Sequence, residues 1–555
     1  MDKIIIYQIF TRLYGNKTHN NIHNGSIEQN GCGKLNFYTL KELKRIKAMG
    51  ISHIWFTGVI RHATQTDYSS FDMPANHPAV VKGKAGSPYA ISDYYDIDPD
   101  LADKPQNRMT EFMNLVDRVH RCGMKVIIDF VPNHVARQYH SIAKPQGVDD
   151  LGQNDDTKLG FSTQNNFYYC PGCELQPSFS LEAEGFSPYV EIPAKATGND
   201  HFDNKPGVND WYETVKLNYG VDYYAGGNCY FYPVPDTWNK MVDIMLFWAG
   251  KGVDAFRCDM AEMVPSAFWA WATAKVKDAY PHIIFIGEVY NPALYRTYIA
   301  SGFDFLYDKV GMYDTLRAVT CFHTSANEIT AAWQANDDIS SHMLYFLEDH
   351  DEQRIASDFF AADAIKGIPA LGVSLLMRNN PFMLYAGQEF GEKGMDEEGF
   401  SGKDGRTTIF DYWSVDSLWR CATGNLTDEQ IDIFDRYQTL LSIARKEKVV
   451  AEGAFFDLMY VNPTSEHFDS HRQYAFLRHI PGVLMLVVAN FNSVSRSVSI
   501  NIPEHAFSFL GIKKQKVKAS DLTSGQTYNL ELSGSAPVTI DVNPWGVAVV
   551  KMKIR

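Results

Sequence analysis

Two short segments of the sequence place a carboxylate at the end of an apolar run: Arg257-Cys258-Asp259 and Ile286-Gly287-Glu288. In an extended strand alternate side chains share a face, so Arg257 and Asp259 would point the same way. A guanidinium two residues before a carboxylate favours an ionised, oriented carboxylate, and such a group can attack an electrophilic carbon. A buried ion pair with only a structural role would show the same pattern.

Two more apolar segments end in the same kind of residue. One ends Asp129-Phe130-Val131-Pro132-Asn133-His134, and the other ends Glu348-Asp349-His350-Asp351. Buried carboxylates are costly and rarely cluster by chance. If these strands end at one edge of a sheet, the clustering favours a functional site over four separate structural ion pairs.

Several carboxylates and an Arg, with no Cys nucleophile or phosphate-binding loop, suit the cleavage of a glycosidic bond. That reaction needs one carboxylic acid to protonate the leaving oxygen and a second carboxylate to attack the anomeric carbon. Asp259 suits the nucleophile, and Glu288, which follows an apolar strand, suits the protonated acid. His134 and His350 suit hydrogen bonds to sugar hydroxyls. A His metal ligand is the alternative, but no HExxH or comparable spacing supports it.

The carboxylates must be held by strands that run in parallel. Near-continuous apolar strands that alternate with helical or polar segments indicate parallel strands covered on both faces. Eight such strands predict an α/β fold of the (β/α)8 TIM-barrel type, with functional residues at the carboxyl ends of the strands. The eight segments are 4–10, 51–59, 124–131, 252–259, 283–288, 303–307, 343–347 and 381–385.

Two regions interrupt the alternation. About a hundred residues after His134 are rich in Asn, Asp, Gly, Tyr and Pro, which predicts an inserted subdomain on the functional face. Beyond a helix at 427–446, short strands separated by Gly, Pro and Asn predict an antiparallel β-sandwich. The predicted units are the first part of the barrel (1–134), the inserted subdomain (135–235), the second part of the barrel (236–447) and the C-terminal domain (448–555).

Composition excludes several classes of protein. The formal charge of −15 over 555 residues, without a long basic run, argues against nucleic acid or an anionic membrane as the partner. No stretch approaches the about 20 apolar residues of a membrane span. The start, Met1 to Tyr7, leads directly into a strand, which predicts a cytoplasmic protein, or a periplasmic or secreted one whose signal has been removed. The eight cysteines suit reduced thiols, and Cys170-Pro171-Gly172-Cys173 lacks the second pair of a zinc site.

These motifs, taken in order, resemble the α-amylase family, glycoside hydrolase family 13. The resemblance rests on Asp129…Asn133-His134, Arg257-x-Asp259, Gly287-Glu288-Val289 and His350-Asp351, and it covers the barrel, the insertion and the C-terminal domain. It implies that Asp259 is the nucleophile, Glu288 the acid/base, and Asp351 the carboxylate that distorts the sugar. It also implies substrate contacts, from Arg257, His134, His350 and a stacking tyrosine, Tyr89, with Arg354 as a further candidate.

Departures from the family pattern concern metal and charge. Many members carry Lys-His where this chain has Glu262 and Met263, so the family's calcium site is doubtful, with Asn133 as its one tentative ligand and no cofactor expected to be required. Asp349 replaces the usual Asn and would repel Asp351 unless a cation such as Arg354 compensates.

The resemblance implies a retaining hydrolase of α-1,4-linked glucans such as maltooligosaccharides or starch fragments. A transglycosylase on the same scaffold is the first alternative, and a non-catalytic glycan-binding protein is the second. Aromatic residues of the insertion are candidate stacking surfaces for glucose rings, or simply core residues: Trp211, Tyr212, Tyr223, Tyr224 and Trp238.

Overall fold

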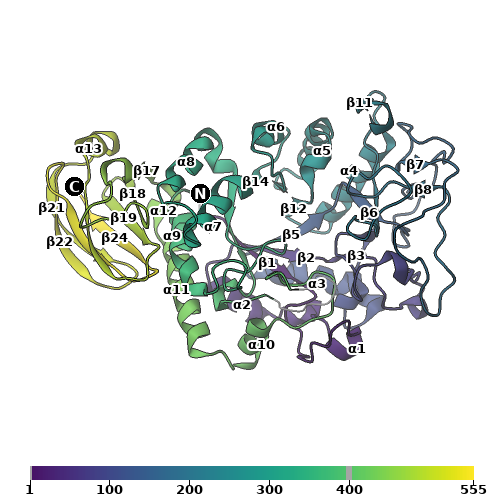
Figure 1. The fold of residues 1–555 in the computed structure, drawn as a ribbon, viewed down its shortest axis with the longest axis horizontal. Helices are drawn as coiled ribbons and strands as arrows, with labels where there is room; N and C mark the ends of the chain where they lie inside the picture. The colour runs from purple at the N-terminus through teal and green to yellow at the C-terminus, as the bar shows by residue number, and fades with distance from the viewer. Residues whose placement is uncertain (1–2, 395–402) are drawn as a thin grey trace.

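A computed structural model describes residues 3–394 and 403–555, and its centre is a closed barrel of eight parallel strands (Figure 1). The strand order confirms the predicted TIM barrel, and each of the eight predicted segments contains one strand. Around the barrel these are β1 (Ile5–Phe10), β2 (His53–Thr57), β5 (Lys125–Phe130), β12 (Ala255–Cys258), β13 (Ile284–Gly287), β14 (Phe305–Tyr307), β15 (Met343–Phe346) and β16 (Phe382–Tyr385).

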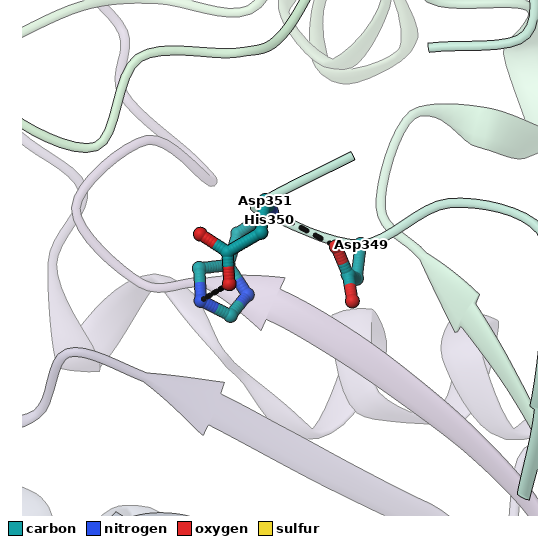
Figure 2. A group of neighbouring side chains, drawn as sticks. All are labelled: Asp349, His350 and Asp351. Carbon is teal, nitrogen blue, oxygen red and sulfur yellow. Dashed lines mark hydrogen bonds and ion pairs between the residues drawn. The ribbon is translucent and has the colours of Figure 1, made fainter. Parts of the chain in front are cut away.

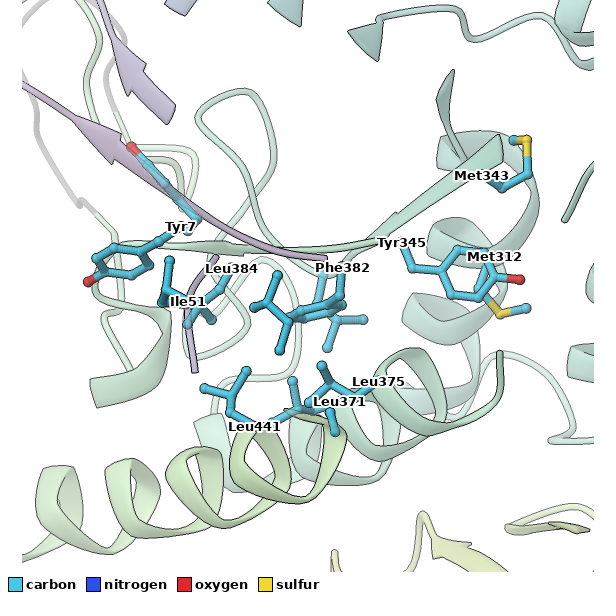
Figure 3. Packing of buried hydrophobic residues seen from close by; sticks show 14 of the residues in the cluster. Tyr7, Ile51, Met312, Met343, Tyr345, Leu371, Leu375, Phe382, Leu384 and Leu441 are labelled. Carbon is cyan, nitrogen blue, oxygen red and sulfur yellow. The ribbon is translucent and has the colours of Figure 1, made fainter. Parts of the chain in front are cut away.

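Alternation along each barrel strand divides the core into two layers. Ile6, Ile127 and Met383 belong to a cluster inside the barrel, while their neighbours in sequence pack outward against the helices. Figure 3 shows this outer layer, where Phe382 and Leu384 of β16 face Leu371 of α9 (Ile368–Leu376) and Leu441 of α11 (Asp428–Lys446). Strands buried on both faces need apolar residues on both faces, which is why they are continuous apolar runs in the sequence.

Helices follow most barrel strands, and the helix predicted at 427–446 is α11 with the capping box of Thr427 and Gln430 in place. The helices are α1 (Ile27–Asn30), α2 (Leu40–Ala48), α3 (Arg108–Arg121), α4 (Asp236–Gly250), α5 (Ser266–Ala279), α6 (Tyr295–Ala300), α7 (Asp314–Thr320), α8 (Glu328–Ala335), α9 (Ile368–Leu376), α10 (Asp416–Thr423), α11 (Asp428–Lys446), α12 (Lys448–Glu452) and α13 (Glu504–Leu510).

The segment between β5 and α4 forms a subdomain of small sheets beside the barrel (Figure 1). Its strands pair as β6 (His134–Ala136) with β9 (Thr214–Lys216), β7 (Tyr169–Cys170) with β8 (Ala194–Lys195), and β10 (Val221–Asp222) with β11 (Asn228–Cys229). A further small sheet, β3 (Ile60–His62) with β4 (Ile91–Ile97), lies in the segment after β2. Pairing of β6 with β9 fixes the inserted chain directly above the end of β5.

The C-terminal region, predicted as an antiparallel β-sandwich, is antiparallel and consists of a larger sheet accompanied by a two-stranded sheet. The larger sheet has the order β17 (Ala454–Asp457), β18 (Gln473–Ile480), β19 (Val483–Asn490), β24 (Val547–Lys553), β21 (Gln515–Asp521) and β22 (Thr527–Leu532). The smaller one pairs β20 (Arg496–Ile500) with β23 (Val538–Val542).

Arg478 of β18 joins this sheet to the barrel. Its guanidinium donates to the Met377 and Leu376 carbonyls at the end of α9, and to the Val450 and Gly453 carbonyls at 2.7 Å each. The side chain is 2% exposed, and burial lowers the pKa of Arg478 to about 9. Four backbone carbonyls thus take the place beside this buried arginine that a carboxylate usually has.

Candidate active site

The three carboxylates predicted as catalytic lie together around one cavity. Asp259 follows β12, Glu288 follows β13, and Asp351 lies beyond β15, all at the carboxyl end of the barrel. They line a cavity of about 320 Å³ together with residues of the inserted subdomain. Asp259 and Glu288 are 6% and 3% exposed. The barrel therefore brings groups 92 residues apart in sequence (259 to 351) into one site.

Arg257 lies beneath the carboxylates and is 1% exposed. Its Nη1 is 2.7 Å from Asp259 Oδ1 and 3.7 Å from Asp129 Oδ1, and its Nη2 is 2.8 Å from Glu288 Oε2. Three aromatic rings surround the guanidinium at 5.3–5.7 Å, those of Trp55, Tyr89 and Tyr307. One fixed cation thus orients the predicted nucleophile and the predicted acid at once.

Protonation of the site follows from this shared cation. Burial raises the pKa of Asp259 to about 8; Arg257 opposes the shift and Glu288 adds to it. Arg257 therefore does not by itself keep Asp259 ionised, as the sequence pattern suggested. Attack on an anomeric carbon requires the ionised form of Asp259, the form that the Arg257 charge favours against burial.

Glu288 is held at both oxygens. The Met260 backbone N–H donates to Oε2 at 2.7 Å, beside Arg257, and the Tyr290 hydroxyl donates to Oε1 at 2.9 Å. Met260 reaches this position with a φ of +44°, in the left-handed region that non-glycine residues rarely adopt. Sequence reasoning missed both donors. The available signal was Tyr290 itself, two residues after Glu288.

Glu262, at one of the positions that depart from the family pattern, connects two loops of the site. Its Oε2 accepts the backbone N–H groups of Tyr290 at 3.1 Å and Asn291 at 3.0 Å. Its own carbonyl accepts the Tyr298 hydroxyl at 3.1 Å. The replacement therefore fixes the backbone of Tyr290, which in turn contacts Glu288.

His350 and Asp351 form an ion pair at the cavity wall. His350 Nε2 lies 3.1 Å from Asp351 Oδ2 and 2.5 Å from the Tyr89 hydroxyl, and the Tyr89 ring stacks on the imidazole. Burial alone would lower the pKa of His350, but the negative charge of Asp351 raises it to about 9. Burial alone would raise the pKa of Asp351, but the positive charge of His350 lowers it to about 2. The pair is imidazolium and carboxylate at neutral pH.

Asp349 stabilises the turn that carries Asp351 (Figure 2). Its Oδ1 accepts the backbone N–H of Asp351 at 2.9 Å and that of Glu352 at 3.0 Å. Burial raises the pKa of Asp349 to about 7; the His350 charge opposes this shift, and Asp351 and Glu352 add to it. Asp349, His350 and Asp351 place one ligand atom each within 4.8 Å. A protonated His350 would disfavour a cation there.

Arg354 does not compensate Asp349 and does not line the described cavity. Its Nη1 lies 2.9 Å from Glu348 Oε2, its Nε donates to Thr407 Oγ1 at 2.9 Å, and it is 1% exposed. Thr407 does line the cavity, so Arg354 supports the wall rather than facing a ligand. The structure thus does not place this predicted substrate contact among the others.

His134 and Trp211 form the subdomain side of the cavity. Their rings are 5.2 Å apart, and His134 is 3% exposed. Burial lowers the pKa of His134 to about 3, so the imidazole is neutral and able to donate or accept a hydrogen bond. Lys82 and Glu213, which the sequence did not single out, pair at 3.0 Å on the same wall.

Of the other aromatic candidates, none lines the described catalytic cavity. Tyr212 and Trp238 are core residues, 8% and 3% exposed. Tyr223 and Tyr224 are 37% and 46% exposed on another part of the inserted subdomain.

The residues at the expected calcium position hold an ammonium group. Lys216 Nζ lies 2.6 Å from Asp200 Oδ1, donates to Asn133 Oδ1, and lies 3.4 Å from the Met263 carbonyl. Lys216 is 2% exposed. Calcium requires six to eight oxygen ligands, and a buried positive charge among these oxygens repels it. The residues present do not fit that ion. Asn133 instead accepts a hydrogen bond from Lys216 at Oδ1 and donates one from Nδ2 to the Gly198 carbonyl.

Comparison with known proteins identifies the family of this chain. Residues 8–425 match the family model for the alpha amylase catalytic domain. Neopullulanase 2 of Thermoactinomyces vulgaris is 21% identical over 515 residues, covering 90% of this chain and 71% of that protein. The alpha-1,4-glucan:maltose-1-phosphate maltosyltransferase of Pseudomonas aeruginosa is 26% identical over 267 residues, 44% of this chain and 31% of that protein.

Solved structures share the fold. The maltogenic alpha-amylase AmyB of Thermotoga neapolitana superposes with a TM-score of 0.63 at 20% identity, covering 100% of this chain and 99% of that one. No helix in 3–394 or 403–555 is long and apolar enough to cross a membrane. The family match spans the barrel, the insertion and the strand ends that carry Asp259, Glu288 and Asp351. The chain therefore belongs to the alpha-amylase family of glycoside hydrolases, whose relatives include both hydrolases and glycosyl transferases.

Proposed function

We propose that this enzyme is a retaining hydrolase of α-1,4-linked glucans, such as maltooligosaccharides and starch fragments. The observation that carries the proposal is the shared guanidinium of Arg257, which holds Asp259 and Glu288 on one cation. Asp259 Oδ1 takes the Arg257 bond, while the buried Oδ2 makes no hydrogen bond to another described residue. That oxygen has its lone pairs available for attack on an anomeric carbon.

In the first step, Asp259 Oδ2 bonds to the anomeric carbon as the glycosidic C–O bond breaks. The proton of Glu288 passes to the leaving oxygen, and the product is a β-linked glycosyl ester. In the second step, the Glu288 carboxylate takes a proton from water while the water oxygen attacks the same carbon. Asp259 leaves as a carboxylate, and two inversions restore the α configuration.

The ion pair of His350 and Asp351 supports substrate distortion in this scheme. Asp351 remains ionised at neutral pH beside a charged imidazole, so both of its oxygens can accept hydrogen bonds from sugar hydroxyls. His350, His134 and Tyr89 offer donors and a ring face on the other sides of the cavity.

The test is the product profile and the anomeric configuration. Proton NMR of maltoheptaose digestion should show the α anomer first, with the β anomer growing only by mutarotation. Early β product would contradict retention. Chromatography with maltoheptaose, starch, pullulan and cyclodextrin decides linkage and chain length, and products longer than maltoheptaose would favour the transglycosylase alternative. That alternative has support from the partial match to a maltosyltransferase.

A further inference from the structure

The inserted subdomain carries a second groove, separate from the catalytic cavity. Its volume is about 500 Å³, and it shares no lining residue with the cavity that holds Asp259. Volumes of this size are typical of small-molecule sites. Its described lining residues are Gly160, Phe161, Tyr169, Cys170, Pro171, Cys173, Phe202, Asp203, Asn204, Asp222 and Tyr224.

The ring of Tyr224 is both exposed and fixed in place. It is 46% exposed, yet its hydroxyl donates to the Tyr169 carbonyl at 2.9 Å and to the Phe202 carbonyl at 3.3 Å. Phe202 packs between Tyr224 and Tyr223, with ring centroids at 5.8 and 4.7 Å. A rigid aromatic face loses little conformational entropy when a ligand packs on it.

The polar side chains of the groove select the chemistry of its ligand. Asp203 and Asp222 are carboxylates, Asn204 is an amide, and the lining residues described above include no Lys or Arg. Asp203 Oδ1 accepts from the Lys205 N–H and lies 2.8 Å from His201 Nε2, and Asp222 Oδ1 accepts from the Tyr224 and Ala225 N–H groups. A carboxylate can accept about four hydrogen bonds, so each retains acceptor capacity at its second oxygen. Hydroxyl donors suit this acceptor capacity, whereas an anionic ligand would be repelled.

We propose that this groove is a second glucan-binding site, in which a sugar ring packs on Tyr224 and its hydroxyls donate to Asp203 and Asp222. Aromatic faces next to acceptors, without cations, suit a neutral polyhydroxylated ligand. The choice of α-glucan as that ligand rests on the proposed function. Binding here would hold a polymer on the enzyme while another part of it occupies the catalytic cavity.

The test is affinity electrophoresis of the full chain in gels that contain soluble starch. Tyr224→Ala should abolish most of the retardation, and Asp203→Asn should weaken it. Tyr232→Ala is the matched control, because Tyr232 is 96% exposed on the same subdomain but does not line the groove. Tyr224→Phe keeps the ring without the carbonyl bonds and should retain binding. Circular dichroism checks that each variant is folded.

Kinetics separate this proposal from the proposed function. Tyr224→Ala should raise the KM for starch at least threefold and leave turnover of 4-nitrophenyl α-maltotrioside within twofold of wild type. If the Tyr224→Ala variant were retarded as strongly as the wild type, the groove would not be a glucan-binding site, whatever the activity of the variant. If retardation depended on Tyr224 but the protein cleaved no α-glucoside, the glucan-binding groove would be supported and the proposed hydrolase function would be rejected.

Discussion

The Tyr290 hydroxyl donates a hydrogen bond to Glu288 Oε1 at 2.9 Å, while Oε2 accepts the Met260 N–H and lies 2.8 Å from Arg257 Nη2 in an ion pair. These contacts orient both oxygens of Glu288, the group that acts first as acid and then as base in the proposed reaction. Because Met260 and Arg257 lie at Oε2, Oε1 is the oxygen placed to hand a proton to the leaving group.

Replacing Tyr290 with Phe removes one of the donors. A hydrogen bond to a charged group contributes about 1.5–3 kcal/mol, so kcat should fall on the order of 10- to 100-fold. Tyr295→Phe is the control, because that hydroxyl is buried and lies outside the lining of the catalytic cavity. An unchanged kcat in Tyr290→Phe would remove Tyr290 from the mechanism.

Glu262→Gln should be nearly neutral and Glu262→Lys damaging. Gln keeps an acceptor for the Tyr290 and Asn291 N–H groups, whereas Lys places a donor against two donors. The loss should be about 1–3 kcal/mol of loop stability, expressed in kcat more than in KM because Glu288 is displaced. Steady-state kinetics of both variants measure how the loss divides between kcat and KM. Equal activity of the two would mean that the Glu262 contact does not position Glu288.

Asp259→Asn and Glu288→Gln should each lower turnover of maltoheptaose by three or more orders of magnitude, with cooperative unfolding retained. The two should separate on α-glucosyl fluoride, whose leaving group needs no proton. Glu288→Gln should recover much of its glycosylation rate on the fluoride, and azide should accelerate turnover further. Asp259→Asn should recover nothing. Near-full activity of Asp259→Asn would exclude it as the nucleophile.

The His350–Asp351 pair predicts a pH-dependent contribution to stability. The pKa of His350 is raised to about 9, so its contribution is complete below about pH 6.5 and is lost as pH rises through about 9. The pKa of Asp351 is lowered to about 2, so its contribution is complete above about pH 4 and is lost as pH falls through about 2. Asp351 is 39% exposed, and screening reduces the pair to about 1–2 kcal/mol.

Thermal unfolding of His350→Gln and wild type, measured from pH 4 to 10, checks this sign. The difference in unfolding free energy should be largest near pH 5–6 and should shrink above pH 9. A difference that grows with alkaline pH would show that His350 is not charged in the folded protein.

Lys216 predicts that the subdomain junction does not respond to calcium. Chelation should leave the melting temperature of the wild type unchanged, and Lys216→Met should lower stability by about 2–3 kcal/mol without rescue by calcium. This is below the full cost of breaking a buried pair, because Asp200 is 37% exposed. Lys216→Asp is the sharper variant: with Asn133 and Asp200 it offers three oxygen-bearing side chains, and calcium should then raise its melting temperature. Destabilisation of the wild type by EDTA would contradict the assignment.

The barrel and its strand ends were predictable because strands covered on both faces are apolar throughout. The same signal is weak in β17, β21 and β22; in β21, for example, exposed Lys516 and Lys518 alternate with buried positions. Within the site, positions that depend on a strand register were foreseen, such as Asp259. Partners set by loops from distant segments were not: Arg354 with Glu348, or Lys216 with Asp200. Nothing in local sequence specifies which carboxylate a buried cation will meet.

The contacts of Arg478 mean that the C-terminal sheet is not an interchangeable module. Its guanidinium donates hydrogen bonds to the carbonyls at the end of α9, the helix that packs on β16. A chain truncated before β18 would leave those carbonyls without their partner next to the barrel wall. Barrel and sheet should therefore melt in one transition, and a C-terminal domain taken from another member of the family would need its own arginine at this point to be accepted.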